Sequence, residues 1–352
     1  MTTEQRRRIA VIPGDGIGQE VVPEGLRVLD AVAPAAFEYE QFPWGCQYYL
    51  ETGRMMDPDG LVRLREFDAI YFGAVGWPGV ADHVSLWGLR LAICQGFDQY
   101  ANIRPVRLLP GVPSPLRDAT AERMDWVVVR ENTEGEYAGI GGRNLAARGP
   151  GKAVAIQAGL FTEEGCDRII RYAFDLALRR RSKVTSVTKS NAQQYGMTLW
   201  DEVFSTVAAD YPDVTTEQWL VDAMAARFVL KPETLDVVVA SNLFADILSD
   251  LGSALAGSLG IAASANLDPE RRYPSMFEPV HGSAPDIAGQ GIANPIGAIW
   301  SAALMLDHLR FEQHAARVIR AIEATTTSGV LTPDLGGQAR TRDVTDAIIR
   351  AL

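Results

Sequence analysis

The chain has 352 residues, of which 47% are hydrophobic and 22% charged, a composition that supplies a large apolar core and excludes a disordered or low-complexity protein. Its formal net charge of −11 disfavours nucleic acid or an anionic membrane as a partner, so an anionic ligand needs a local basic pocket. The length indicates two domains, and no apolar run in the sequence is long enough to cross a membrane.

The N-terminal segment and the cysteines predict a cytoplasmic protein. Arg6–Arg8 precede only a short apolar run, Ile9–Ile12, which is far shorter than the apolar segment of a signal peptide. Cys46, Cys94 and Cys166 are odd in number and widely spaced, unlike the cysteines of a disulfide scaffold or a zinc site. We therefore expect a reducing environment.

Short β-branched runs that end in polar or glycine residues predict buried strands of an α/β sheet. In chain order these runs are Ile9–Ile12, Ala69–Phe72, Trp126–Val129, Val184–Val187 and Val237–Ala240. Helical patterns cover Gln19–Val32, Glu163–Arg179, Thr198–Ala209 and Leu243–Ala256. This alternation favours largely parallel, helix-covered sheets, which usually bind ligands at the carboxyl ends of their strands.

Two stretches rich in glycine or proline predict connections outside the regular elements. Residues 105–116 predict a crossing between the two halves of the chain. The second stretch runs from Gly135 to Gly151 and predicts a protruding loop or arm.

The run Gly14–Gly18 (GDGIG) follows the first strand and has two interpretations. Glycines there could let backbone amides approach a phosphate at the start of a helix, or they could simply form a tight turn. The third glycine comes two residues after the second, and no acidic residue ends a second strand at the expected distance. The pattern therefore does not indicate a Rossmann fold.

Asp246 and Asp250 are four residues apart and so lie on one face of a predicted helix. Like charges at this spacing cost about 0.2–0.5 kcal/mol unless a cation lies between them. Mg²⁺ and Mn²⁺ accept carboxylate oxygens, so the pair predicts a metal site. The alternative is two solvated aspartates, but the neighbouring residues Leu243–Leu251 are mostly apolar and leave little solvated face.

A turn-rich run, Glu278–Gly289, contains too many small residues for a strand or a helix core. Such a loop can surround an adenosine or only connect two elements. His281 within it would by itself more often be structural than a ligand. Lys189 follows a predicted strand, where a surface lysine is the ordinary expectation.

The ordered set of motifs is far more specific than any one of them. The segments are IPGDGIG at 12–18, NIRP at 102–105, VRENTEGEY at 129–137, TKSN at 188–191, VDAMA at 221–225, SNLFADILSDL at 241–251, EPVHGSAPDIAG at 278–289 and IANP at 292–295. This set resembles the β-decarboxylating dehydrogenases of 2-hydroxy acids, which include isopropylmalate and isocitrate dehydrogenases. Residues 82–88, 97–107, 129–137 and 264–271 are most similar to the tartrate/D-malate branch.

The resemblance implies a two-domain α/β fold of the isopropylmalate/isocitrate dehydrogenase type, with the active site in the interdomain cleft. It implies a cofactor-binding domain from residues 1–103 plus 257–352, and a dimerisation and metal/substrate domain from residues 104–256. It also implies a homodimer in which Lys189 and Asp222 enter the partner's active site.

The resemblance further implies the chemistry of particular residues. Hydride passes from C2 of the substrate to NAD, and the resulting β-keto acid loses CO₂. Tyr137 and Lys189 match the catalytic acid and base, and Arg104 and Arg130 match arginines that bind substrate carboxylates. The implied ligands of Mg²⁺ or Mn²⁺ are Asp222, Asp246 and Asp250. The implied cofactor contacts are His281, Gly282, Ser283, Ala284, Asp286 and Asn294.

Three departures from the family pattern concern the substrate pocket. Cys94 replaces a clamp arginine, and an added Arg90 precedes it by one helical turn. Arg90 either still binds the carboxylate that is lost or contacts a substituent on C3 of the substrate, and we favour the second interpretation. Residues 192–196 (AQQYG) and Ala245 also differ from the branch. The sequence thus predicts NAD- and metal-dependent oxidation and decarboxylation of a malate-type 2-hydroxy diacid, with tartrate or D-malate as the first candidate. Two alternatives stay open: a 3-substituted malate in a specialised biosynthetic pathway, and a catalytically silent ligand-binding paralogue.

Overall fold

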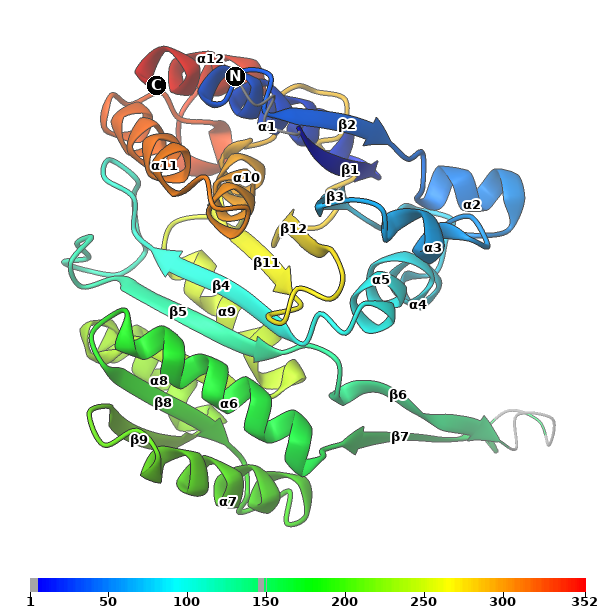
Figure 1. Ribbon diagram of the computed structural model, residues 1–352, viewed down its shortest axis with the longest axis vertical. Coiled ribbons are helices and arrows are strands. Elements are labelled where there is room, and N and C mark those ends of the chain that lie inside the picture. The colour runs from blue at the N-terminus through cyan, green and yellow to red at the C-terminus, as the bar shows by residue number, and fades with distance from the viewer. Residues whose placement is uncertain (1–5, 145–148, 150) are drawn as a thin grey trace. The chain divides into compact units, whose positions relative to one another are not determined.

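A computed structural model describes residues 6–144, 149 and 151–352 (Figure 1). The chain forms two compact units. Unit 1 contains Met1–Gln99, Ile103–Asp125 and Gly252–Leu352, and unit 2 contains Tyr100–Asn102 and Trp126–Leu251. Unit 1 is therefore built from both ends of the chain.

The strands of unit 1 follow the order β2-β1-β3-β12-β11-β4. They are β1 (Arg7–Gly14), β2 (Phe37–Gln41), β3 (Ala69–Ala74), β4 (Ala101–Arg107), β11 (Ala263–Leu267) and β12 (Ser275–Pro279). β1 is parallel to both β2 and β3, and β12 is parallel to β3. β11 is antiparallel to β12, so the sheet is mixed.

Alternate residues of the central strands of unit 1 face two separate layers of helices, as the two-residue period of a strand requires. Ile12 and Phe72 lie in a core cluster with Phe42, Trp44 and Cys94. Tyr71 points the other way and donates a hydrogen bond of 2.8 Å to the Ala298 carbonyl. The first layer contains α2 (Cys46–Thr52), α3 (Gly60–Leu64), α4 (Asp82–Ser85), a π-helical turn (Leu86–Arg90) and α5 (Leu91–Gly96). The second contains α1 (Gly18–Val32), α10 (Ile296–His308), α11 (Glu312–Thr327) and α12 (Thr341–Ala351) (Figure 1).

Unit 2 has an all-parallel sheet in the order β5-β10-β8-β9. The strands are β5 (Asp125–Glu131), β8 (Lys183–Thr188), β9 (Thr215–Leu220) and β10 (Val237–Ala240). The helices α6 (Glu163–Leu178) and α7 (Gly196–Ala209) cover one face, and α8 (Val221–Leu230) and α9 (Asn242–Leu255) lie behind the strands in Figure 1. Because all four strands are parallel, their carboxyl ends lie at one edge of the sheet.

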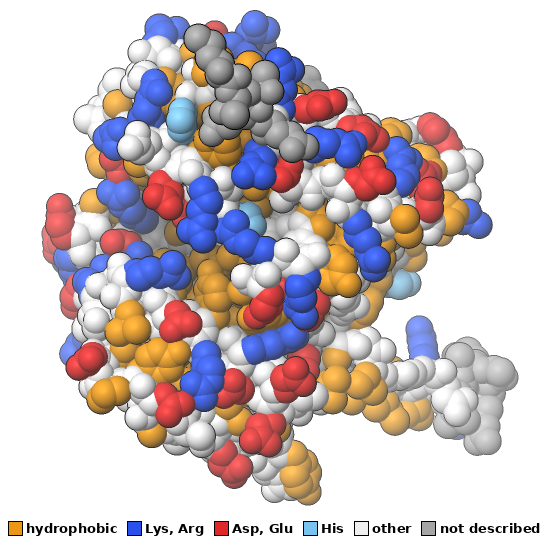
Figure 2. Space-filling view, in the orientation of Figure 1, with side chains coloured by type: hydrophobic (Ala, Val, Ile, Leu, Met, Phe, Trp, Pro, Cys, Tyr) orange, Lys and Arg blue, Asp and Glu red, His pale blue; other side chains and the backbone are white. Residues whose placement is uncertain are grey.

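The glycine-rich stretch forms an antiparallel hairpin of β6 (Gly135–Asn144) and β7 (Val154–Leu160), which confirms the predicted arm. Residues 145–148 and 150 of that stretch lie outside the described residues. The hairpin extends away from the sheet of unit 2 (Figure 1). Hydrophobic side chains lie along it (Figure 2). Ile140, Val154, Ile156 and Leu160 are the exposed apolar residues of this arm.

The five predicted strands and four predicted helices are confirmed, with ends that shift by a few residues. The division of the chain differs from the expected one at residues 104–125 and 252–256, which belong to unit 1, and at residues 100–102, which belong to unit 2. The physical reason is local packing, since β4 lies beside β11 and the following loop is anchored by a 2.6 Å hydrogen bond from Ser114 Oγ to the Leu255 carbonyl. Among the described helices, none combines the length and apolarity needed to cross a bilayer.

Candidate active site

A connected polar cluster lies at the carboxyl ends of β5 and β10 in unit 2. Arg130 is the second-to-last residue of β5 and is only 2% exposed. Its Nε and Nη2 donate to Asn242 Oδ1 at 3.0 and 2.7 Å, and its Nη1 donates to Asp246 Oδ1. Tyr137 donates to Asp246 Oδ2 at 3.2 Å, and the guanidinium of Arg130 lies 5.3 Å from the Tyr137 ring centre. The fold thus brings together three predicted site residues: the predicted acid Tyr137, the cationic Arg130 and the carboxylate of Asp246.

The two aspartates of α9 lie one turn apart on the same helix. Asp246 is half-buried against Arg130, whereas Asp250 is exposed. Ala245, one of the departures from the branch, directly precedes Asp246 and is fully buried. Two carboxylates at this spacing have the donor chemistry that a hard divalent cation requires.

Lys189 and Asp222 form a second cluster at the carboxyl ends of β8 and β9. The register of these strands pairs Thr188 with Leu220, so the residues that follow them lie close together. Lys189 Nζ donates to Asp222 Oδ1 at 2.5 Å. This hydrogen bond holds the pKa of the Asp222 carboxyl below its usual value.

Within the described part of the chain, no three His, Cys, Asp or Glu side chains come together as a group that could hold a metal ion. Asp222 pairs with Lys189, while Asp246 pairs with Arg130. One chain therefore presents the predicted metal ligands as two separate sets.

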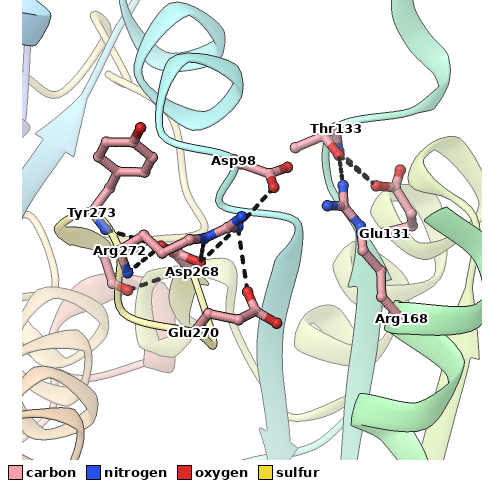
Figure 3. Close-up of polar contacts among 9 residues, drawn as sticks. Asp98, Glu131, Thr133, Arg168, Asp268, Glu270, Arg272 and Tyr273 are labelled. Carbon is pink, nitrogen blue, oxygen red and sulfur yellow. Dashed lines mark hydrogen bonds and ion pairs between the residues drawn. The ribbon is translucent and has the colours of Figure 1, made fainter. Parts of the chain in front are cut away.

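Glu131 is a titratable residue that the sequence reasoning missed. It is buried at the end of β5, where it accepts hydrogen bonds from the backbone N–H groups of Thr133 at 2.9 Å and Glu134 at 2.8 Å. Arg168 donates to the Thr133 hydroxyl at 2.9 Å, as Figure 3 shows. Burial raises the pKa of Glu131 to about 7, although the hydrogen bonds from Thr133 and Glu134 lower it. The only signal in the sequence was its place at a strand end.

We expect the free energy of unfolding to fall as the pH rises from about 5 to about 8, because Glu131 then loses its proton in a buried site. A folded-state pKa of about 7 against a usual 4.5 corresponds to about 3 kcal/mol, fully present below pH 4.5 and lost as the pH rises through 7. Chemical denaturation at several pH values measures this slope. Glu131→Gln should have a flatter curve, and parallel curves for the two proteins would contradict the assignment.

In unit 1 the GDGIG run is a tight turn, which decides between its two interpretations. Gly14 and Gly16 have φ angles of 70° and 55°. The amide of Asp15 donates to the Ala74 carbonyl at 2.8 Å, and the amide of Ile17 donates to the Ser283 carbonyl at 2.8 Å. A Cβ on Gly16 would lie 2.0 Å from that same carbonyl, so glycine is required there. The turn supports the loop that contains Ser283 instead of offering its amides to a phosphate.

A cavity of about 410 Å³ adjoins this loop in unit 1. Its lining residues are Ile17, Ser258, Gly260, His281, Ala284, Ile287, Ile292, Asn294, Pro333 and Asp334. Three predicted cofactor residues, His281, Ala284 and Asn294, therefore meet at one cavity. Among the described residues, His281 Nε2 has no hydrogen-bond partner, and burial lowers the pKa of this imidazole. A mostly apolar cavity with a buried, unpaired ring nitrogen fits an adenosine.

Sequence reasoning missed two polar residues of this cavity, Ser258 and Asp334. Asp334 accepts hydrogen bonds from Ser258 Oγ at 2.5 Å and from Asn294 Nδ2 at 3.1 Å. The sequence around Asp334 is a proline-containing turn and gave no sign of this contact. Of the other predicted cofactor residues, Gly282 and Asp286 are exposed, and Ser283 is buried.

Glu20 holds the far end of the same loop. Its carboxylate accepts the backbone N–H groups of Gly289 at 2.5 Å and Gly291 at 2.9 Å. Because Glu20 lies in the first turns of α1, the loop is fixed at both ends to the segment that follows β1.

The two departures near residue 90 occupy different environments in unit 1. Cys94 is fully buried in the core cluster. Arg90 closes the π-helical turn, and its guanidinium pairs with Glu278 Oε1 at 2.7 Å and donates to Asn266 Oδ1 at 3.3 Å. The side chains of Arg90 and Glu278 are 11% and 6% exposed, so this is a buried ion pair. Arg104 lies in β4 and is also buried.

Residues 8–348 match the family model described as isocitrate/isopropylmalate dehydrogenase, and the chain belongs to this family. It is 57% identical over 350 residues to a probable tartrate dehydrogenase/decarboxylase of Agrobacterium vitis, covering 98% of this chain and 96% of the relative. It is 54% identical over 356 residues to the decarboxylating D-malate dehydrogenase of Escherichia coli (strain K12), covering 98% of both.

Among solved structures, the isocitrate dehydrogenase of Methylococcus capsulatus has a TM-score of 0.89 and 35% identity, and the match covers 98% of this chain and 99% of that one. The predicted fold class and the predicted resemblance to the tartrate/D-malate branch are therefore confirmed. The protein is an enzyme of a dehydrogenase family.

Proposed function

We propose that this protein oxidises and decarboxylates a malate-type 2-hydroxy diacid, with NAD as hydride acceptor and Mg²⁺ or Mn²⁺ as a required cation. Tartrate and D-malate are the leading substrates. The observation that carries the proposal is the cluster of Arg130, Asp246 and Tyr137, which combines a carboxylate-binding guanidinium, a cation-binding carboxylate and a proton donor. Relatives at 54–57% identity whose names describe tartrate and D-malate dehydrogenases support it.

Asp246 and Asp250 of one chain, with Asp222 of a second copy, would hold the divalent cation. The cation supplies a Lewis acid for the C2 oxygen and for the enolate that decarboxylation leaves. Support comes from the two separate sets of carboxylates in one chain, because a site completed by a second copy explains why Asp222 lies apart from Asp246.

The remaining residues would act on the substrate directly. Arg104 and Arg130 bind its carboxylates through paired N–H groups. Lys189 Nζ of the second copy takes the proton of the C2 hydroxyl, and the Tyr137 hydroxyl returns a proton to the enol carbon. Arg90 can contact a substituent on C3 only if it keeps Glu278 as a partner, which the five donors of a guanidinium allow.

A homodimer is part of this proposal, and exposed apolar side chains of unit 2 support it. An isolated two-stranded hairpin is marginally stable in water, yet the β6–β7 arm carries exposed Ile140 and Ile156 (Figure 2). Tyr195, within the unusual segment 192–196, is 82% exposed, and Leu230 of α8 is 72% exposed. A second copy that covers these side chains removes them from water.

The cofactor part of the proposal predicts a preference for NAD⁺ over NADP⁺. Asp286 is exposed and lies in the chain between Ala284 and Ile287, which line the cavity. A carboxylate there would accept a hydrogen bond from the ribose 2′-hydroxyl and repel a 2′-phosphate. Asp286→Arg should lower kcat/KM for NAD⁺ by about 10- to 150-fold, the range of one hydrogen bond to a charged group. Steady-state kinetics with both cofactors measures the change.

The matched control for this charge change is Glu38→Arg, an exposed residue of β2. It should leave both cofactor constants unchanged. Equal kcat/KM for NAD⁺ and NADP⁺ in the unaltered enzyme would contradict the role of Asp286.

The function itself is tested by assaying purified protein with NAD⁺ and Mn²⁺ against L- and meso-tartrate, D-malate and a series of 3-substituted malates. Absorbance of the reduced cofactor reports oxidation, and released CO₂ reports decarboxylation. Highest kcat/KM on a 3-substituted malate would favour the specialised substrate, for which the buried Arg90–Glu278 pair and Cys94 are the motivating observations. No turnover on any member would favour a silent ligand-binding paralogue.

A further inference from the structure

A second cavity in unit 1, of about 310 Å³, is lined mainly by cationic side chains. We call it the arginine pocket, and its lining residues are Arg7, Arg65, Phe67, Asp68, Arg271, Arg272, Tyr273, Pro274, His308, Leu309 and Arg310. Five arginines and a single carboxylate line it, in a protein whose net charge is −11. Such a concentration of positive charge needs an explanation.

The arginine pocket lies at the opposite edge of the sheet of unit 1 from the adenosine-sized cavity. Arg7 begins β1, Asp68 directly precedes β3, and Pro274 directly precedes β12. These three strands are parallel, so all three residues lie at their amino ends. The GDGIG turn and the loop of His281 follow the carboxyl ends of β1 and β12. The pocket is therefore separate from the proposed cofactor site.

Two of the lining arginines already have carboxylate partners. Arg272 pairs with Asp98 at 2.9 Å, Asp268 at 3.1 Å and Glu270 at 3.4 Å, as Figure 3 shows. Arg7 pairs with Asp68 at 3.0 Å. The positive charges of Arg7 and Arg272 are therefore balanced by neighbouring carboxylates.

The charges of the other three arginines, Arg65, Arg271 and Arg310, are not balanced in this way. Across residues 6–144, 149 and 151–352, no carboxylate lies within ion-pair distance of Arg65 or Arg271, and Arg310 reaches Glu312 only at 3.9 Å. Arg271 donates to the His308 carbonyl at 2.7 Å, and Arg65 lies 5.0 Å from the ring centre of Tyr273. Both contacts hold a guanidinium in position without neutralising it.

The crowding of these cations is electrostatically unfavourable. Burial and the neighbouring Arg310 and Arg7 lower the pKa of Arg271. Burial and the neighbouring Arg271 and Arg310 also lower the pKa of His308, to about 4, so this imidazole is neutral at pH 7. A bound anion would relieve the repulsion between the arginines.

The backbone at two of these arginines is also unfavourable for a side chain. Arg271 and Arg310 have φ angles of 57° and 70°, in the left-handed region that favours glycine. Arg310 follows the C-terminus of α10, and the next amide, of Phe311, donates back to the Leu306 carbonyl at 2.8 Å. Helices with this ending commonly carry glycine at the position of Arg310. An arginine at each of these two positions points to a use for its side chain.

We propose that the arginine pocket binds the phosphate group of a small phosphorylated molecule, at a site separate from the active site. Its cations come from the start of β1, the turn before β3, the loop before β12 and the end of α10, so they approach from several directions. A tetrahedral phosphate accepts hydrogen bonds in several directions, whereas a carboxylate accepts them in one plane. A cavity of about 310 Å³ is large enough for a phosphorylated metabolite or the phosphates of a nucleotide.

The test is calorimetric titration of metal-free protein with pyrophosphate at constant ionic strength. We expect one site per chain, weaker binding of citrate at equal charge, and about a tenfold loss of affinity for each of Arg65→Ala and Arg271→Ala. Arg320→Ala, an exposed arginine of α11 outside the pocket, is the matched control and should bind normally. Parallel titrations with ATP and with a sugar bisphosphate distinguish the two sources of phosphate.

Arg310→Gly separates binding from folding. Glycine removes the left-handed strain, so its Tm should equal or exceed that of the unaltered protein, while its affinity for pyrophosphate falls. No binding of pyrophosphate, unchanged binding in the Arg65→Ala/Arg271→Ala double variant, or equal binding of citrate would each overturn the proposal. None of these measurements uses turnover, so they are independent of the proposed dehydrogenase activity.

Discussion

Mixing two inactive variants, Asp222→Asn and Asp246→Asn, is expected to restore about a quarter of the unaltered activity. Each substitution removes a proposed cation ligand and should lower kcat by at least about 100-fold when present in every subunit. In a mixed dimer, one site combines an intact Asp246 with the intact Asp222 of the other subunit. Random pairing makes about half of the dimers mixed, with one working site out of two in each.

Co-expression with two affinity tags isolates the mixed dimers, and turnover per dimer is then measured directly. The matched control pairs Lys189→Ala with Asp222→Asn, because both residues would be donated to the other subunit's site. This second pair damages both sites of a mixed dimer and should recover no activity. If the first pair also recovers none, each site uses the Asp222 of its own chain.

Removal of divalent cations should abolish turnover, and Mn²⁺ or Mg²⁺ should restore it. The carboxylates of Asp246 and Asp250 lie one helical turn apart, so they repel each other unless a cation lies between them. Asp250→Asn should raise the Mn²⁺ concentration needed for half-maximal activity by about tenfold or more. Turnover measured across a Mn²⁺ titration gives this value.

Asp213→Asn is the control for that experiment, since Asp213 is an exposed acidic residue of unit 2 away from α9. It should require the same Mn²⁺ concentration as the unaltered enzyme. Full activity in protein whose metal content is far below one ion per chain would contradict the metal site.

Much of the fold could be predicted because its strands are short, apolar and clearly bounded. Val237–Ala240 forms β10 within the predicted limits, and β5 extends the predicted Trp126–Val129 by one residue before it and two after it. The two extra residues at the carboxyl end, Arg130 and Glu131, are polar. A prediction that ends each strand at its last apolar residue therefore makes β5 too short. Residues 104–125 were harder to assign, because their unit depends on contacts with the distant Leu255.

The site could be predicted in part. Parallel strands bring together the residues that follow them, and Lys189 and Asp222 do meet after β8 and β9. The pairing of Arg90 with Glu278 could not be predicted, since the partners are 188 residues apart and nothing local marks Glu278 as a partner. Asp334 at the adenosine-sized cavity was missed for the same reason. Buried ion pairs depend on the three-dimensional path of the chain.

The discontinuous make-up of unit 1 has a consequence for biosynthesis. β12 lies between β3 and β11, so the central part of that sheet stays incomplete until residues near 279 have left the ribosome. Until then β3 has an unpaired edge, the kind of surface through which nascent chains aggregate. Unit 2 is almost continuous in sequence, from Trp126 to Leu251, so its parallel sheet can form before β12 has been synthesised. Translation should therefore yield a folded middle segment first, with an N-terminal segment that depends on chaperones until the last third of the polypeptide emerges.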